Sequence, residues 1–285
     1  MDHGLLSTVY RLFSKGYAMF FKLLSIEWTR LSRRPLLWVT LAVTILYMSL
    51  ALANFYKTSQ VELLDGTLKM PGIAFDLANA LDQLTIVIPL LVIIAGNLMG
   101  NDYSQRTNQH WLRRAPRHSS LVAKFSILTA LTLFIQILTL VIGWAVGYYY
   151  KTYVYHVPDV NNVNWLATLA APFYMTLVNL PYLALTLLIT VVVRSTFFSI
   201  VLGLGYTQIL EFMLVGIFYG KPWTKWLFTN LHFSASFLLN DIGSRVPKLP
   251  EHILAPAPAL LVATLYTMIF MILAIWFYRR QDVGG

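Results

Sequence analysis

The chain has 285 residues, of which 58% are hydrophobic and 12% are charged, and its formal net charge is +9. Soluble domains usually carry about 25% charged residues, so this composition is typical of a chain that folds in lipid. A nucleic-acid partner is not expected, because the basic residues lie between apolar runs rather than on a soluble face. The absence of cysteine excludes disulfides, thiolate catalysis and thiolate-bound metals.

Six apolar runs are long enough to cross a bilayer. About 20 apolar residues span the hydrocarbon core as a helix, and a helix satisfies its own backbone hydrogen bonds there. The sequence therefore predicts an all-α integral membrane protein, with one transmembrane domain over residues 1–285. The predicted spans are about 36–56, 75–99, 125–148, 165–193, 197–218 and 257–278.

The basic residues predict the orientation of these spans. Of the 21 Lys and Arg residues, 14 lie before the first span, between the second and third, between the fourth and fifth, or after the sixth. Loops rich in Lys and Arg stay on the cytoplasmic side. We therefore expect both termini in the cytoplasm.

The N-terminal segment 5–34 precedes the first span and mixes apolar residues at helical spacing with Arg11, Lys15 and Lys22. This pattern predicts an interfacial elbow helix that lies on the anionic inner leaflet. A cytoplasmic helix packed on a soluble partner is the alternative. Pro35 then stands at the start of the first span, where its missing N–H does no harm.

Three of the polar residues within the predicted spans are candidates for a function: Asp82 in the second, Asn179 in the fourth and Glu211 in the fifth. Glu211 lies roughly 21 Å from the inner end of its span, at about 1.5 Å per residue. An ionisable group at this depth faces protein or water rather than lipid. Each of the three residues is therefore expected either to line a transport pathway or to form a buried interhelical hydrogen bond.

The longest segment outside the spans, apart from the N-terminal one, is 219–256, and it is predicted to lie outside the cell. Its apolar part, 226–239, is too short and too polar to cross the membrane. A re-entrant or surface helix is expected there, and a loosely packed outer loop is the alternative.

The familiar motifs of catalysis and nucleotide binding are missing. The sequence contains no G-x-x-x-x-G-K-S/T, no H-E-x-x-H and no G-x-S-x-G. The six histidines show no ligand spacing. We therefore predict neither a catalytic residue nor a metal site in this chain.

Three stretches together suggest a family. The first is "EWTRLSRRPLLW" before the first span, the second is the basic loop 100–124, and the third is "FYRRQDVGG" at the end. This arrangement resembles the membrane permeases of type-2 ABC exporters. That family reads approximately E-x-x-R-x-x-R-x-P before its first span, and the matching positions here are Glu27, Arg30, Arg33 and Pro35.

The resemblance implies a function. In this family the first cytoplasmic loop docks on a separate ATPase, so the resemblance makes 100–124 a coupling loop. The residues expected to couple are Asp102, Thr107, Trp111, Leu112, Arg113 and Pro116. The chain itself would need no cofactor, since ATP and Mg would bind the ATPase. Two permeases, as two copies or as homologues, and two ATPase subunits would form an exporter in the inner membrane of a prokaryote.

Two other functions stay open from the residues alone. A membrane-embedded enzyme, such as an acyltransferase or an intramembrane hydrolase, would need paired catalytic residues at one depth. A non-transporting membrane anchor or regulatory subunit would not need six spans with acids inside them. The substrate of an exporter could be an amphipathic peptide, a hydrophobic drug or a lipid.

Overall fold

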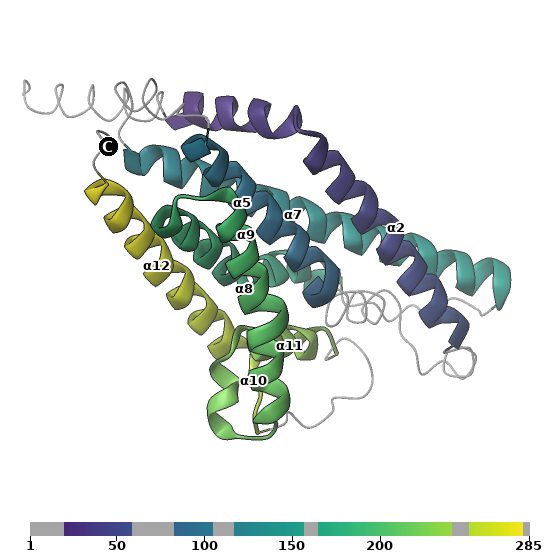
Figure 1. Ribbon diagram of the computed structural model, residues 1–285. Helices are drawn as coiled ribbons and strands as arrows, with labels where there is room; N and C mark the ends of the chain where they lie inside the picture. The colour runs from purple at the N-terminus through teal and green to yellow at the C-terminus, as the bar shows by residue number, and fades with distance from the viewer. Residues whose placement is uncertain (1–19, 59–82, 105–116, 157–164, 241–250, 282–285) are drawn as a thin grey trace, which may run out of the picture.

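The computed structural model describes residues 20–58, 83–104, 117–156, 165–240 and 251–281, and every regular element in these ranges is helical (Figure 1). A helix over residues 20–32 comes first. The long helices are α2 (Pro35–Thr58), α5 (Ile88–Ser104), α7 (Arg117–Tyr149), α8 (Trp165–Val193) and α12 (Pro256–Arg280). The shorter ones are α9 (Thr196–Leu204), α10 (Glu211–Ile217) and α11 (Phe228–Asn240).

Four short helical segments that are not α-helical complete the described fold. Three are π-helical, namely η1 (Gln83–Val87), η2 (Tyr150–Val154) and η3 (Gly205–Leu210), and η4 (Pro222–Trp226) is a 3-10 helix. The fifth predicted span is thus a composite of α9, η3 and α10. A π-helical turn inside an α-helix often marks a functional position.

Six helices are long and apolar enough to cross a membrane, as the sequence predicts. They cover Pro35–Asn54, Leu84–Tyr103, His118–Val154, Thr168–Val193, Thr196–Ile217 and Pro256–Arg280. The predicted all-helical class with six spans is therefore confirmed for the described residues. Several predicted positions lie outside the described residues, namely residues 5–19, Asp82 and the residues predicted to couple, Thr107, Trp111, Leu112, Arg113 and Pro116.

Helix α8 is the centre of the bundle and packs against α5, α7, α9, α11 and α12. Three of its threonine hydroxyl groups are buried among apolar neighbours and bond to the helix itself. Thr176, Thr186 and Thr190 each donate a hydrogen bond to the carbonyl four residues earlier. This local pairing lets a central helix bury threonine without leaving its hydroxyl unsatisfied.

Helices α5 and α9 approach each other closely because glycine faces the partner helix. A Cβ atom at Gly100 would lie 2.6 Å from the Cα of Thr196, which is backbone and cannot move aside. A Cβ at Gly203 would lie 2.8 Å from Val92. Small residues of this kind allow membrane helices to pack backbone against backbone.

The polar ends of the bundle differ. The helix 20–32, the end of α5, the start of α7, the turn between α8 and α9 and the end of α12 gather at one end, which we call the basic end (Figure 1). The basic end carries Arg30, Arg34, Lys124, Arg194 and Arg279. Helices α10 and α11 lie at the opposite end.

Candidate functional site

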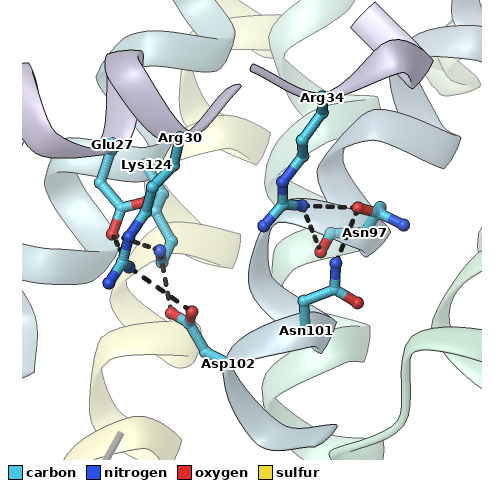
Figure 2. Close-up of polar contacts among 7 residues, drawn as sticks. All are labelled: Glu27, Arg30, Arg34, Asn97, Asn101, Asp102 and Lys124. Atoms are coloured by element: carbon cyan, nitrogen blue, oxygen red, sulfur yellow. Dashed lines mark hydrogen bonds and ion pairs between the residues drawn. The ribbon is translucent and has the colours of Figure 1, made fainter. Parts of the chain in front are cut away.

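Four charged side chains from three helices meet at the basic end (Figure 2). Lys124 of α7 lies between two carboxylates: its Nζ is 2.6 Å from Oε1 of Glu27 and 2.9 Å from Oδ2 of Asp102. Lys124 is fully buried, and Glu27 and Asp102 are 4% and 8% exposed. Glu27 comes from the helix 20–32 and Asp102 from the end of α5, so a single ammonium group holds both segments.

Arg30 is the fourth member. Its Nη1 lies 3.4 Å from Glu27 Oε1 and 3.9 Å from Asp102 Oδ1, and its side chain is partly exposed. Glu27, Arg30, Asp102 and Lys124 form what we call the four-charge cluster. Its two positive and two negative charges balance, so no buried charge is left without an opposite one. Removing one partner would leave such a charge, at a cost of about 3–5 kcal/mol.

A second contact lies beside the cluster. Arg34, just before α2, donates from Nη1 to the side-chain oxygen of Asn97 at 2.5 Å and to the Asn97 carbonyl at 3.2 Å. Asn101 donates to the same Asn97 side-chain oxygen at 3.0 Å. Burial lowers the pKa of the Arg34 guanidinium, while the carboxylates of Asp102 and Glu27 act in the opposite direction. The start of α2 is thereby fixed to α5.

The cluster includes residues from both sides of the connection between α5 and α7. Residues 105–116 connect α5 to α7, with Asp102 before them and Lys124 after them. The ion pairs of the cluster therefore join both flanks of this connection to the helix 20–32. Within the described ranges no three His, Cys, Asp or Glu side chains gather in a way that could hold a metal.

The structure joins two sets of residues that the sequence treats as separate. Of the predicted elbow residues, Arg30 contacts Asp102, a predicted coupling residue, directly, and Glu27 is joined to Asp102 through Lys124. Of the other elbow residues, Arg33 is exposed, and Pro35 is the first residue of α2. Sequence reasoning counted Lys124 as a loop charge and missed its role in the cluster. A signal was present, because Leu121 and Leu128 lie three and four residues away on the same helix face and are fully buried.

Glu211 and Asn179 lie away from the cluster, and both contact helix α11. Oε1 of Glu211 accepts a hydrogen bond from the backbone N–H of Thr229 at 2.8 Å, and Oδ1 of Asn179 lies 3.1 Å from Nδ1 of His232. Both residues are buried, and both partners belong to α11. The contacts are therefore interhelical hydrogen bonds.

Residues 23–209 match a family model described as ABC-2 family transporter protein. The matched region is about two thirds of the chain and includes the whole four-charge cluster. The chain belongs to the ABC-2 transporter family. The resemblance to the permeases of ABC exporters is thereby confirmed, and the chain is a membrane component of an ABC-2 transporter. No curated protein sequence matches the chain.

The matched region ends two residues before Glu211. In this ABC-2 protein, the cluster and the contact between Arg34 and Asn97 thus belong to the part shared with the family. The contact between Asn179 and His232 lies partly outside the matched region, and the contact between Glu211 and Thr229 lies wholly outside it. The family match therefore does not account for these contacts of α11.

Proposed function

We propose that this chain is the permease subunit of an ATP-driven exporter. It forms the substrate path together with a second permease, either an identical copy or a homologue, and it couples through residues 100–124 to a separate ATPase. ABC-2 membrane proteins are typically the non-catalytic transmembrane part of a transporter, and this sequence has no P-loop. ATP and Mg therefore bind the ATPase, of which two copies are expected.

The observation that carries the proposal is the pairing of Lys124 with both Glu27 and Asp102. The connection 105–116 leaves α5 and enters α7 close to these residues. A force applied to the connection by the ATPase then moves α5, α7 and the helix 20–32 as one body. Loss of one partner of a buried ion pair costs about 3–5 kcal/mol, which far exceeds thermal energy. The three segments are therefore expected to stay joined while they move.

Within the connection, Trp111 and Leu112 are the apolar residues that dock in the ATPase. A buried aromatic anchor inside a polar rim is the usual arrangement of a strong protein contact. Arg113 provides part of that rim, and Thr107 and Pro116 shape the turns on either side. Asp102 connects the docked segment to the four-charge cluster.

The basic end faces the cytoplasm in this proposal, because positively charged segments stay on that side. Both termini are then cytoplasmic, and the protein is a multi-pass protein of a prokaryotic inner membrane. The exposed Phe21 and Trp28 lie on one face of the helix 20–32, with the exposed Lys22 on another. This amphipathic surface suits an elbow helix at the lipid–water boundary.

The decisive experiment is co-purification with the ATPase encoded beside this chain, followed by ATPase and transport assays in lipid nanodiscs and vesicles. Peptides, hydrophobic drugs and lipids are tested as substrates that stimulate hydrolysis. A membrane-embedded enzyme would turn over a substrate without the ATPase, and an anchor would bind the ATPase without supporting transport. Failure of every neighbouring ATPase to bind the chain would contradict the proposal.

One variant tests the coupling route within the same assay. Glu27→Gln keeps the size of the side chain but removes the charge that pairs with Lys124. A charge-assisted hydrogen bond is worth about 1.5–3 kcal/mol, so transport per ATP hydrolysed should fall roughly tenfold or more. Arg33→Gln, at an exposed position of the same segment, is the matched control and should leave this ratio unchanged.

A further inference from the structure

Helix α11 has no N-terminal cap of its own. The first N–H groups of a helix lack intrahelical partners, and a Ser, Thr, Asp or Asn at the preceding position usually accepts from one of them. Here the preceding residue is Leu227, whose carbonyl accepts the first helical hydrogen bond, from Leu231, at 3.0 Å. Leucine has no acceptor in its side chain, so α11 needs an acceptor from elsewhere.

Glu211 supplies that acceptor from the fifth span. Its Oε1 receives the backbone N–H of Thr229, the second residue of α11, at 2.8 Å. Glu211 is fully buried, and it takes part in none of the ion pairs found among the described residues. The partial positive charge at a helix N-terminus makes this a favourable place for a carboxyl oxygen. A side chain of α10 thus caps a different helix.

Helix α11 packs partly through apolar side chains, since the buried ring of Phe228 lies against Tyr182 and Tyr266, and it makes two further polar contacts. The contact between Asn179 and His232 joins α11 to α8, three residues after Thr229 and therefore on the same side of α11. Ser234 donates to the carbonyl of Leu254 at 2.6 Å. Helix α11 is therefore attached to three segments of the chain by separate hydrogen bonds.

The Glu211 carboxyl group is held by one well-formed hydrogen bond, the bond from the Thr229 N–H, among the described residues. The hydroxyl groups of Tyr182 and Thr229 lie within reach of this carboxyl group, but neither makes a hydrogen bond of good geometry to it. A contact that rests on a single strong hydrogen bond can open when the carboxyl group moves.

The segment before Glu211 offers a way to open it. The π-helical turn η3 directly precedes Glu211, and Gln208 within it donates to the Leu84 carbonyl of the π-helical turn η1 at 2.8 Å. A change of η3 from π-helical to α-helical bonding removes one residue from the turn. Since each residue of an α-helix turns by about 100°, such a change would carry the Glu211 carboxyl group away from Thr229.

We propose that Glu211 is a latch that holds α11 against the fifth span, and that its release frees α11 at the end of the protein opposite the basic end. The latch would act with or without a bound ATPase. Glu211 caps another helix, whereas a purely structural residue would stabilise only its own helix.

The test measures how accessible α11 is. The chain contains no cysteine, so Ser234→Cys places a single reporter on the buried face of α11. The reporter weakens the Ser234 contact to Leu254 equally in every variant that is labelled at position 234. The full-length protein in nanodiscs is labelled with a maleimide, and the labelling rate is recorded. Adding Glu211→Ala should raise the rate at least about tenfold. Glu211→Gln, which keeps an oxygen acceptor in place, should raise it less, and Glu251→Ala, at an exposed acid, should not raise it.

Two further variants separate a latch from other roles. Thr132→Cys is a reporter buried in α7, and equal acceleration there and at position 234 would show general loosening and overturn the proposal. Leu227→Asp in the Glu211→Ala background gives α11 a cap of its own. Labelling at position 234 should stay fast, because capping is restored without attachment to α10. Recovery of slow labelling, or no effect of either Glu211 variant, would overturn the latch.

Discussion

The Nζ of Lys124 lies 2.6 Å from Oε1 of Glu27, although the two residues are 97 positions apart in the chain. No other described hydrogen bond of Glu27 reaches beyond its own helix, where Arg30 is its partner. The ammonium group of Lys124 therefore connects the segment before the first span to the start of the third.

Replacing Lys124 by methionine should strongly destabilise the protein. The change leaves Glu27 and Asp102 buried near each other with Arg30 as their remaining cation, and losing one partner of a buried pair costs about 3–5 kcal/mol. Thermal unfolding of the purified protein in nanodiscs measures the effect. Lys221→Met, at an exposed position, is the matched control and should change stability by less than about 0.5 kcal/mol. Equal melting temperatures for the two variants would contradict the role of Lys124.

Replacing Trp111 and Leu112 together by aspartate should abolish binding of the ATPase while the permease still inserts. Two charges in place of apolar anchors remove the contact that excludes water from the interface. Pull-down of the ATPase and substrate-stimulated hydrolysis report the result. Trp223→Asp, at an exposed tryptophan of η4 on the opposite end, should leave both unchanged. Retained stimulation in the double variant would show that the ATPase docks elsewhere.

An environment-sensitive dye should distinguish two faces of the helix 20–32. A dye on Phe21→Cys should report lipid, because Phe21 is 63% exposed and shares its face with the exposed Trp28. A dye on Thr29→Cys, about 80° around the helix and also exposed, should report water. Neutralising Lys22 would weaken the attraction to anionic lipid by about 1 kcal/mol. Identical aqueous spectra at both positions would argue against an interfacial helix.

Replacing Gly100 by alanine should force α5 and α9 apart. The added Cβ would lie 2.6 Å from the Thr196 Cα, and overpacking of this kind costs about 1–3 kcal/mol. Gly205→Ala, in the same pair of spans, is the control because a Cβ there has nothing within 4 Å. Thermal unfolding should therefore separate the two alanine variants. A neutral Gly100→Ala would mean that the helices shift without cost.

Much of the fold was predictable because each span is a continuous apolar run of about the bilayer thickness. The class, the number of spans and their approximate positions follow from this local pattern. The cluster could not be predicted in the same way, since the meeting of Glu27, Asp102 and Lys124 depends on how three helices pack. Lys124 looked like a loop charge because it immediately precedes the apolar run. Helix α7 begins earlier, at Arg117, and places Lys124 on its buried face.

The same limit applies to Glu211. Its depth in the fifth span was readable, but its partner is a backbone N–H of another helix, and backbone groups leave no mark in the sequence. The missing cap at Leu227 is a usable sign, because a helix that begins after leucine must find an acceptor elsewhere. A helix start without a capping residue, together with an acid deep in a neighbouring span, would have suggested the contact between Glu211 and Thr229.

The 97 residues between Glu27 and Lys124 also impose an order on biosynthesis. At about 5–20 residues per second, roughly 5–20 s pass between the synthesis of the two residues. During that interval two spans enter the membrane while Glu27 has Arg30, one turn later, as its ion-pair partner. The N-terminal helix therefore completes its attachment only after α7 has been made, so the start of the chain is among the later parts to reach its final place.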